Sequence, residues 1–351
     1  MKRHSLVGMS RVALMWILVV TFVVASFGLA FGQSNEVIVI LPGGTLEKVL
    51  RKSWVEPFEK KYNAKAIVTT GLTMENLAKL RAQKGNPQID VVIFDPPGAI
   101  PAANEGLLEK LDPGRIPNLK DQYPFDIVKH GLFATQWLSN QGLAYNTKFI
   151  KEPPKSWADL WKPEYKGKVL LPDISTSHGV FFVSIVSKMQ TGTDLYNTEA
   201  AFGRLKTLRP NVLTFYTSHD QVAQLLNSGE AWLVPWVSDR ALTQVAAKAP
   251  IAITVPKEGA IYFTSHIGIA KGSKKKDLAE KYLDTAISAE AQLMNAQEAF
   301  LGPANAKVKL EGYLAENLAY GDQLKKLVAP DWNKLDQIRN EWTERWNREI
   351  R

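Results

Sequence analysis

Short polar stretches follow the predicted strands of this chain, and they hold the residues that could do chemistry. "PGGT" at 42–45 follows the first strand, and its glycines would let backbone N–H groups approach an anion closely. "FDPPG" at 94–98 places Asp95 at the end of another strand. Four further stretches combine hydroxyl, imidazole, carboxylate and guanidinium groups: "ISTSHG" at 174–179, "FYTSHD" at 215–220, "PWVSDR" at 235–240 and "YFTSH" at 262–266. None contains a G-x-S-x-G elbow or a recognised acid–base spacing, which favours binding over catalysis.

These stretches supply a set of candidate ligand-binding residues. Other interpretations stay open for some of them. Residues 43–45 also fit a plain strand–helix turn, Asp95 an ordinary turn former, and Trp236 a core side chain. The candidates are Gly43, Gly44, Thr45, Phe94, Asp95, Thr176, Ser177, His178, Tyr216, Trp236, Asp239, Arg240, Phe263, Ser265 and His266.

Three histidines, His178, His219 and His266, fall in these stretches. Imidazole suits transition metals, so one interpretation is a metal site. However, no i,i+4 histidine pair and no acidic cluster accompanies them. The alternative is a set of neutral hydrogen-bonding histidines, or partly charged ones beside an anion. We therefore expect no bound metal and no cofactor.

The elements that must position these residues alternate between strands and helices. In the first half, Thr45 should be the N-cap of a helix that Pro57 bends or splits, and another helix should cover 73–83. The strands predicted there are 35–41, 63–70 and 89–95. Strand–helix alternation of this kind is typical of an open α/β sheet with mostly parallel strands.

After Thr147 the alternation begins again, which predicts a second α/β unit. The C-terminal segment 331–350 is amphipathic, and we expect its apolar stripe to pack on a lobe. That stripe comprises Trp332, Leu335, Ile338, Trp342 and Trp346. Two lobes joined by strands leave a cleft between them, and such clefts are preferred ligand sites.

The passage from Asn146 to Asp173, "NTKFIKEPPKSWADLWKPEYKGKVLLPD", has no reactive group to offer. Its adjacent prolines stiffen the loop. Ser156 can cap a short helix over "WADLW", which Trp157, Leu160 and Trp161 would anchor. We interpret the passage as the scaffold that begins the second lobe.

Residues 1–32 are typical of an export signal. Lys2, Arg3 and Arg11 precede a long apolar run, and small residues end it before Gln33. The run is also long enough for an uncleaved membrane anchor. The chain has no cysteine, so neither a disulfide nor thiol chemistry is available. The formal charge of +8 is mild and scattered, without the aromatic-interleaved basic stripe of a nucleic-acid binder.

The passage from Gly142 to Asp173 resembles the mid-chain segment of periplasmic solute-binding proteins of ABC importers, closest to the spermidine/putrescine-binding group and its relatives. "IDVVIFD", "GEAWLVPWVSDRAL" and "LGPANAKVKL" are similar to further segments of that family. The resemblance implies a two-lobed periplasmic-binding-protein fold of type II, in which each lobe is an open, mostly parallel sheet flanked by helices. On that pattern lobe one is 33–142 plus 266–303, and lobe two is 145–262 plus 305–351. The strands near 142–146 and 262–266 would act as hinges.

The resemblance also implies that the ligand should differ from the polyamines of the related proteins. Polyamine-binding relatives use stacked tryptophans and paired carboxylates, but only Trp236 matches here. Phe263 stands at a tryptophan position, and Ser265 and Ser177 stand at carboxylate positions. The helix starts near 43–45 and 176–177 with Arg240 favour an anion, whereas Asp95 and Asp239 could receive an amine. We therefore expect an anionic or zwitterionic solute; a polyamine or a metal ion is the alternative.

The resulting functional prediction is a non-enzymatic, periplasmic capture protein. It would act as a monomer and deliver a small-molecule solute to the permease and ATPase of an ABC transporter. A secreted hydrolase and a sensory or scaffold protein of the same fold are the competing classes, and no nucleic acid is expected as a partner.

Overall fold

The computed structural model describes residues 35–123 and 131–351. Residues 37–351 form one compact unit. The predicted export signal, 1–32, lies outside the described residues. No helix within the two described ranges combines the length and apolarity of a membrane span.

The first part of the sheet is built from short apolar strands with helices between them. β1 and β3 are parallel, with Val39 opposite Val91. Each residue of β3 is buried, which explains its unbroken apolar sequence. The elements here are β1 (Glu36–Leu41), β2 (Lys65–Thr70), α4 (Thr73–Ala82), β3 (Val91–Phe94), α5 (Pro96–Asn104) and a 3₁₀ turn (Pro117–Asp121).

The N-cap residue of the first helix is Gly44 and not the predicted Thr45, and near Pro57 the helix changes its winding without an interruption. α2 (Thr45–Leu50) runs into a π-helical turn (Arg51–Val55), and α3 (Glu56–Tyr62) follows. Pro57 is the second residue of α3, which continues directly from the π-helical turn, so its missing N–H removes one backbone hydrogen bond of the continuous helix. The helix therefore changes its winding just before the proline.

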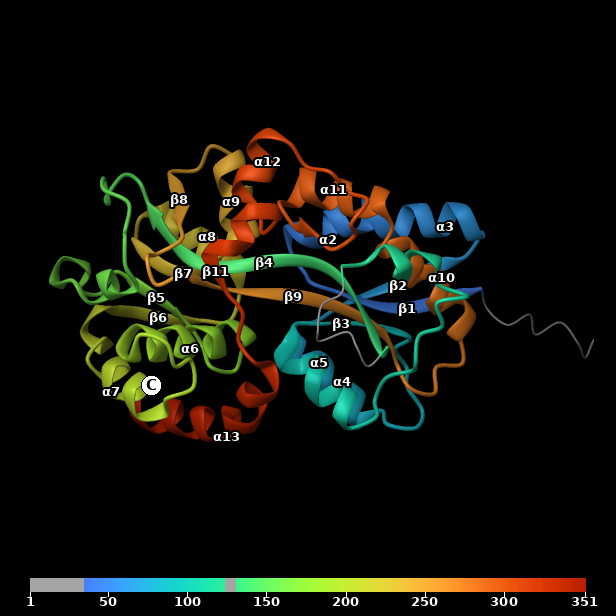
Figure 1. Ribbon diagram of the computed structural model, residues 1–351, viewed down its shortest axis with the longest axis horizontal. Coiled ribbons are helices and arrows are strands. Elements are labelled where there is room, and N and C mark those ends of the chain that lie inside the picture. Colours follow the sequence, from blue (N-terminus) through green and yellow to red (C-terminus); the bar gives the residue numbers. More distant parts are fainter. Residues whose placement is uncertain (1–34, 124–130) are drawn as a thin grey trace, which may run out of the picture. The chain divides into compact units, whose positions relative to one another are not determined.

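Two long strands, β4 (Phe133–Asn146) and β9 (Ala260–Ile269), run antiparallel through the middle of the sheet. The strand order is β2-β1-β3-β9-β4-β7-β5-β6, so β9 borders the first part and β4 borders the second (Figure 1). The two predicted parallel parts therefore belong to one continuous sheet. Every residue of β4 is buried, which removes the alternation that would mark it as a strand.

The second part of the sheet repeats the parallel arrangement. β5 pairs in parallel with both β6 and β7. Helices α6 and α7 lie on the same side of the sheet as α13, whereas α9 lies on the other side (Figure 1). The elements are β5 (Val169–Pro172), α6 (Ser177–Thr191), α7 (Thr198–Lys206), β6 (Val212–Tyr216), α8 (His219–Ser228), β7 (Leu233–Val237), α9 (Ser238–Ala246) and β8 (Ile251–Thr254).

The scaffold role of the 146–173 passage is supported by its cap. Ser156 Oγ accepts from the Ala158 amide at 3.1 Å and starts the 3₁₀ helix Trp157–Trp161. The same hydroxyl donates to the Glu258 carboxylate. Trp157 is fully buried, and its Nε1 donates to the Gly259 carbonyl at 2.8 Å. The passage is thereby tied to the chain that returns through β9.

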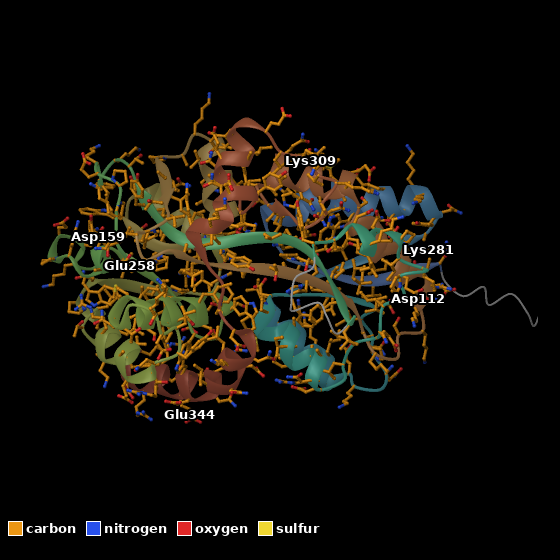
Figure 2. The ribbon with its side chains drawn as sticks, viewed as in Figure 1. Asp112, Asp159, Glu258, Lys281, Lys309 and Glu344 are labelled. Carbon is orange, nitrogen blue, oxygen red and sulfur yellow. The ribbon has the colours of Figure 1, made fainter. Side chains whose placement is uncertain are left out.

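The chain ends in helices that close both parts. Trp342 and Trp346 are fully buried in one core with residues of α6 and β6, which confirms the predicted stripe on α13. Exposed charged side chains such as Asp112, Lys281 and Lys309 project outward (Figure 2). The last elements are α10 (Lys276–Ala286), α11 (Ala289–Ala299), β10 (Gly302–Pro303), α12 (Gly312–Asn317), a 3₁₀ turn (Gly321–Lys326), β11 (Leu327–Val328) and α13 (Trp332–Glu349).

Candidate functional site

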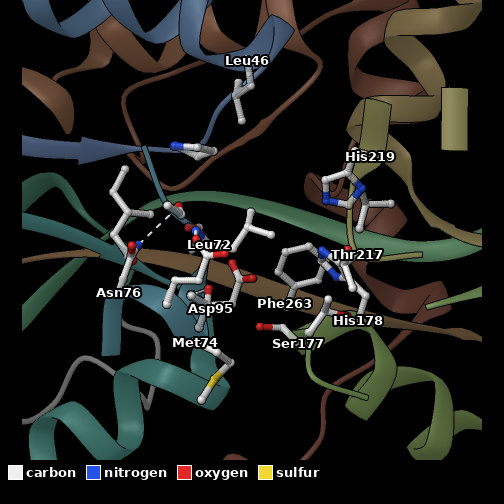
Figure 3. A pocket seen from close by; sticks show the side chains of 18 of the residues that line it. Leu46, Leu72, Met74, Asn76, Asp95, Ser177, His178, Thr217, His219 and Phe263 are labelled. Atoms are coloured by element: carbon white, nitrogen blue, oxygen red, sulfur yellow. Dashed lines mark hydrogen bonds between the residues drawn. The ribbon is translucent and has the colours of Figure 1, made fainter. Parts of the chain in front are cut away.

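A cleft of about 550 Å³ opens where strand ends and helix starts converge (Figure 3). Its walls come from the carboxyl ends of β1, β3, β6 and β7 and from the starts of α4, α6, α8 and α9. In open α/β sheets this is where ligands bind, because the strand ends leave room and the helix starts offer N–H groups.

Most of the predicted site residues meet in this cleft, although they come from distant parts of the chain. They are brought together by the folding of both sheet parts around β4 and β9. The predicted residues that line the cleft are Asp95, Thr176, Ser177, His178, Tyr216, Asp239, Arg240, Phe263 and Ser265.

Three predicted residues, Phe94, Trp236 and His266, do not line it. Each neighbours a strand residue that does, and adjacent strand side chains point to opposite faces. Trp236 is 1% exposed and lies behind His219. His266 is fully buried, where Thr264 Oγ1 lies 2.8 Å from its Nε2, and burial lowers its pKa to about 3.

The predicted glycine-rich turn reaches the cleft only through Pro42, and the candidates Gly43, Gly44 and Thr45 do not line it. Gly44 has a φ of 75°, and a Cβ there would stand 3.0 Å from the Asp220 carboxylate. Thr45 lines a separate cavity of about 50 Å³ next to Arg240. The turn thus faces the residues of the second part across the opening.

The structure adds lining residues that sequence reasoning missed. Thr73 and Asn76 lie at the start of α4, directly after a predicted strand, so the rule applied to 42–45 would also have found them. His219 lies in the predicted polar stretch 215–220, but the predicted ligand-binding residues do not include it. Trp137 had no signal, because no strand was predicted around it; its ring stacks on that of Trp54 at 5.8 Å.

Asp95 is a half-buried carboxylate facing the cleft (Figure 3). Burial raises its pKa to about 6, opposed by hydrogen bonding with Thr73, Ser177 and Ser265. Its own amide donates to Thr73 Oγ1 at 2.9 Å. Within the described ranges, Asp95 makes no ion pair with a lysine, arginine or histidine. Its carboxylate is therefore available as an acceptor for a ligand.

Asp239 and Arg240 form the second charged group. Arg240 Nε lies 3.4 Å from Asp239 Oδ2, and Ser139 Oγ donates to the other carboxylate oxygen. Burial raises the pKa of Asp239, while Arg240 opposes that rise. Burial lowers the pKa of Arg240, although Asp239, Asp220 and Asp95 all favour its charged form. The guanidinium retains donors for a ligand, because it has five N–H groups.

An aromatic wall faces these charges. The rings of His178 and His219 lie 5.0 Å apart, and Phe263 packs against His178 at 5.6 Å. Burial, with Arg240 adding to it, lowers the pKa of His178 to about 3. Burial lowers the pKa of His219 well below its usual value, and His178 and Arg240 lower it further. Both imidazoles are therefore neutral at physiological pH.

The start of α6 is built for close approach to a ligand. Thr176 caps it by accepting from the Gly179 amide at 3.2 Å. A Cβ at Gly179 would stand 2.3 Å from the Asp173 carbonyl oxygen, so only glycine fits. The Ser177 hydroxyl is buried near the Asp95 carboxylate and lowers its pKa, but it makes no hydrogen bond of normal geometry. Such a group stabilises the folded state only when a ligand or water satisfies it.

A metal centre finds no support in the described part of the chain, where no three histidine, cysteine, aspartate or glutamate side chains gather around a possible ion. The arrangement instead joins an isolated carboxylate, a paired guanidinium, neutral imidazoles, hydroxyls and helix starts around an aromatic surface. That combination is chemically suited to a small polar organic molecule.

Comparison with known proteins agrees with this geometry. A family model for bacterial extracellular solute-binding proteins matches residues 53–320. The spermidine/putrescine-binding periplasmic protein of Escherichia coli is 30% identical over 292 residues, 79% of this chain and 76% of the relative. The gamma-aminobutyric acid-binding protein of Pseudomonas aeruginosa is 27% identical over 297 residues, 80% of this chain and 81% of the relative.

Solved structures place the fold in the same group. A crystal structure of an ABC transporter protein from Clostridium perfringens has a TM-score of 0.71 and 30% identity, covering 90% of this chain and 100% of that one. The expected two-lobed periplasmic-binding-protein fold is thereby confirmed. The chain belongs to the bacterial extracellular solute-binding proteins, the solute-capturing components of ABC transporters.

Proposed function

We propose that this protein captures a small zwitterionic solute that carries an ammonium group and a carboxylate or phosphonate. The observation that carries the proposal is Asp95, a half-buried carboxylate that makes no ion pair with a cation of the described chain. A buried charge without a partner is costly, so a ligand ammonium is the fitting complement.

The opposite charge of the ligand has its own partners. Arg240 and the start of α6 face the same cleft, and helix starts favour anions. Asp239 is already paired with Arg240, so a second ammonium would find no free carboxylate there. Of the two named relatives, one is named for gamma-aminobutyric acid, a zwitterion, and the other for polyamines. The charge pattern here favours the first chemistry.

Delivery completes the proposed role. Solute-binding proteins of this class pass their ligand to a membrane permease driven by an ATPase, and we propose the same partners here. The export signal at 1–32 supports a periplasmic location for the mature chain. We propose that the chain acts without catalysis and as a monomer.

The test is a thermal-shift panel on residues 33–351. γ-Aminobutyric acid, β-alanine and 2-aminoethylphosphonate should raise the melting temperature, because a ligand at about 100 times its Kd stabilises by about 2.7 kcal/mol. Butyrate and butylamine, which each carry one charge, serve as matched controls and should shift it less. Micromolar calorimetric binding of spermidine, with no response to any zwitterion, would sink the proposal.

A further inference from the structure

A hydrogen bond from the buried Trp236 holds one edge of the His219 ring. The Trp236 Nε1–H group donates to His219 Nδ1 at 3.0 Å. An indole N–H can only donate, so Nδ1 must carry a lone pair, and the proton of the neutral imidazole sits on Nε2. Trp236 is 1% exposed within β7, where it has no access to the cleft.

His219 itself lines the cleft, beside His178 (Figure 3). Since its Nδ1 is turned to the buried indole, the Nε2–H edge is the one left for a ligand. The neighbouring His178 Nδ1 is buried and has no hydrogen-bond partner. An unsatisfied buried nitrogen next to a fixed N–H donor marks a place where a ligand completes the hydrogen bonding.

Charged and titratable groups near this pair come from several elements, and the cleft carboxylates Asp95 and Asp239 are among them. His178 comes from α6, Arg240 from α9, Tyr216 from β6 and Asp220 from α8. The Tyr216 hydroxyl is occupied, because it donates to the Pro235 carbonyl at 2.6 Å. The wall therefore presents the guanidinium and a fixed imidazole N–H as donors.

We propose that Trp236 is a positioning residue that holds His219 as the Nε2–H tautomer, so that His219 donates to an anionic oxygen of the solute and rejects an ammonium at the same place. Two donors facing each other leave both unsatisfied in a desolvated site, which disfavours a diamine. The ligand part of this inference rests on the proposed zwitterion; the tautomer does not.

The first arm of the test needs no ligand. In ¹⁵N-histidine-labelled protein, the nitrogen chemical shifts of His219 should report a protonated Nε2 and a bare Nδ1. They should stay constant as the pH falls from about 8 to about 6.5, where a free imidazole would already be about half protonated. Trp236→Phe keeps the ring and removes the donor, so Nδ1 becomes free to bind a proton and His219 should titrate at a higher pH. Trp232→Phe is the matched control, because its Nε1 donates to the Gly229 carbonyl instead.

The second arm measures binding of γ-aminobutyric acid and putrescine by calorimetry. Glutamine places an amide N–H near the Nε2 position and asparagine near the Nδ1 position. His219→Gln should therefore keep most of the affinity for γ-aminobutyric acid, and His219→Asn should lose at least about tenfold. Trp236→Phe should reduce the ratio of the affinity for γ-aminobutyric acid to the affinity for putrescine.

The two arms test the positioning role of Trp236 and the donor role of His219 separately. A His219 that is protonated on Nδ1, or that titrates alike in wild type and Trp236→Phe, overturns the positioning role. Equal affinities of the glutamine and asparagine variants overturn the donor role of Nε2. If no zwitterion binds the wild type, the proposed function fails, and the nitrogen shifts alone then judge the tautomer.

Discussion

At the scale of single residues, burial of the Asp95 charge lowers the stability of the folded protein, whereas the same charge favours ligand binding. Burial raises the pKa of Asp95 from 3.8 to about 6. The Asp95 carboxyl group therefore keeps its proton up to a higher pH in the folded protein than in the unfolded chain. The folded state then binds the extra proton between about pH 4 and pH 6, so this group makes stability fall as the pH rises through that window. Above pH 6 the ionised Asp95 lowers the free energy of unfolding by its full amount.

Asp95→Asn should remove that cost. At pH 7 we expect the ligand-free variant to be more stable by about 1–3 kcal/mol, and to lose the fall in stability between pH 4 and 6. Its affinity for a zwitterion should drop at least about tenfold, because the ammonium loses its partner. Urea unfolding at several pH values and calorimetry measure both effects.

The exposed Glu344→Gln is the control, and it should change neither quantity. In the wild type, affinity should fall below pH 6, where Asp95 becomes protonated. A variant that binds as tightly as the wild type would remove Asp95 from the site.

Much of this residue pattern could be predicted from sequence, because strand ends and helix starts carry recognisable polar residues. What could not be predicted is which of two adjacent residues faces the cleft. Val237 lines it and Trp236 does not; Ser265 lines it and His266 does not. A shift of one residue along a strand reverses the face, and local sequence does not fix that phase when both faces are buried.

At the scale of elements, α5 shows how tertiary contacts override local rules. Its sequence, "PPGAIPAAN", contains three prolines and was not predicted as a helix. Pro96 and Pro97 fit the first turn, but Pro101 removes the N–H that would bond to the Pro97 carbonyl. Arg339 of α13 supplies a donor to that oxygen, at 3.3 Å. A compensation from so far along the chain leaves no local trace.

The start of α6 gives a prediction at the same scale. Gly179→Ala would push a methyl group against the Asp173 carbonyl and Ile174 backbone, so we expect a loss of about 1–3 kcal/mol in the free energy of unfolding. Gly203→Ala in α7, where a Cβ meets nothing within 4 Å, should gain about 0.5–1 kcal/mol. Urea titrations of both variants test the contrast; equal effects would contradict the tight approach at Gly179.

At the scale of the whole molecule, the cleft residues come from both sheet parts. Thr73 and Asp95 belong to the first part, and His178 and Arg240 belong to the second. A ligand that bonds to both stabilises the closed arrangement by its differential contacts. The hinge strands near 142–146 and 262–266, and the lobe boundaries with them, stay predictions.

Small-angle scattering tests closure. The radius of gyration of residues 33–351 should fall when a ligand that binds in the thermal-shift panel is added. Asp95→Asn at the same ligand concentration should contract less, because fewer molecules are occupied. An unchanged radius at proven saturation would mean that the cleft does not close.

The continuous sheet has a consequence for how this protein can be divided or inherited. β9 completes the hydrogen bonding of β3, and β4 completes that of β7. A gene fragment that encoded one half alone would leave a buried strand with bare N–H and C=O groups along its edge, an invitation to aggregation. Domain shuffling of single halves is thereby discouraged, so the two halves are expected to duplicate, diverge and be expressed as one piece.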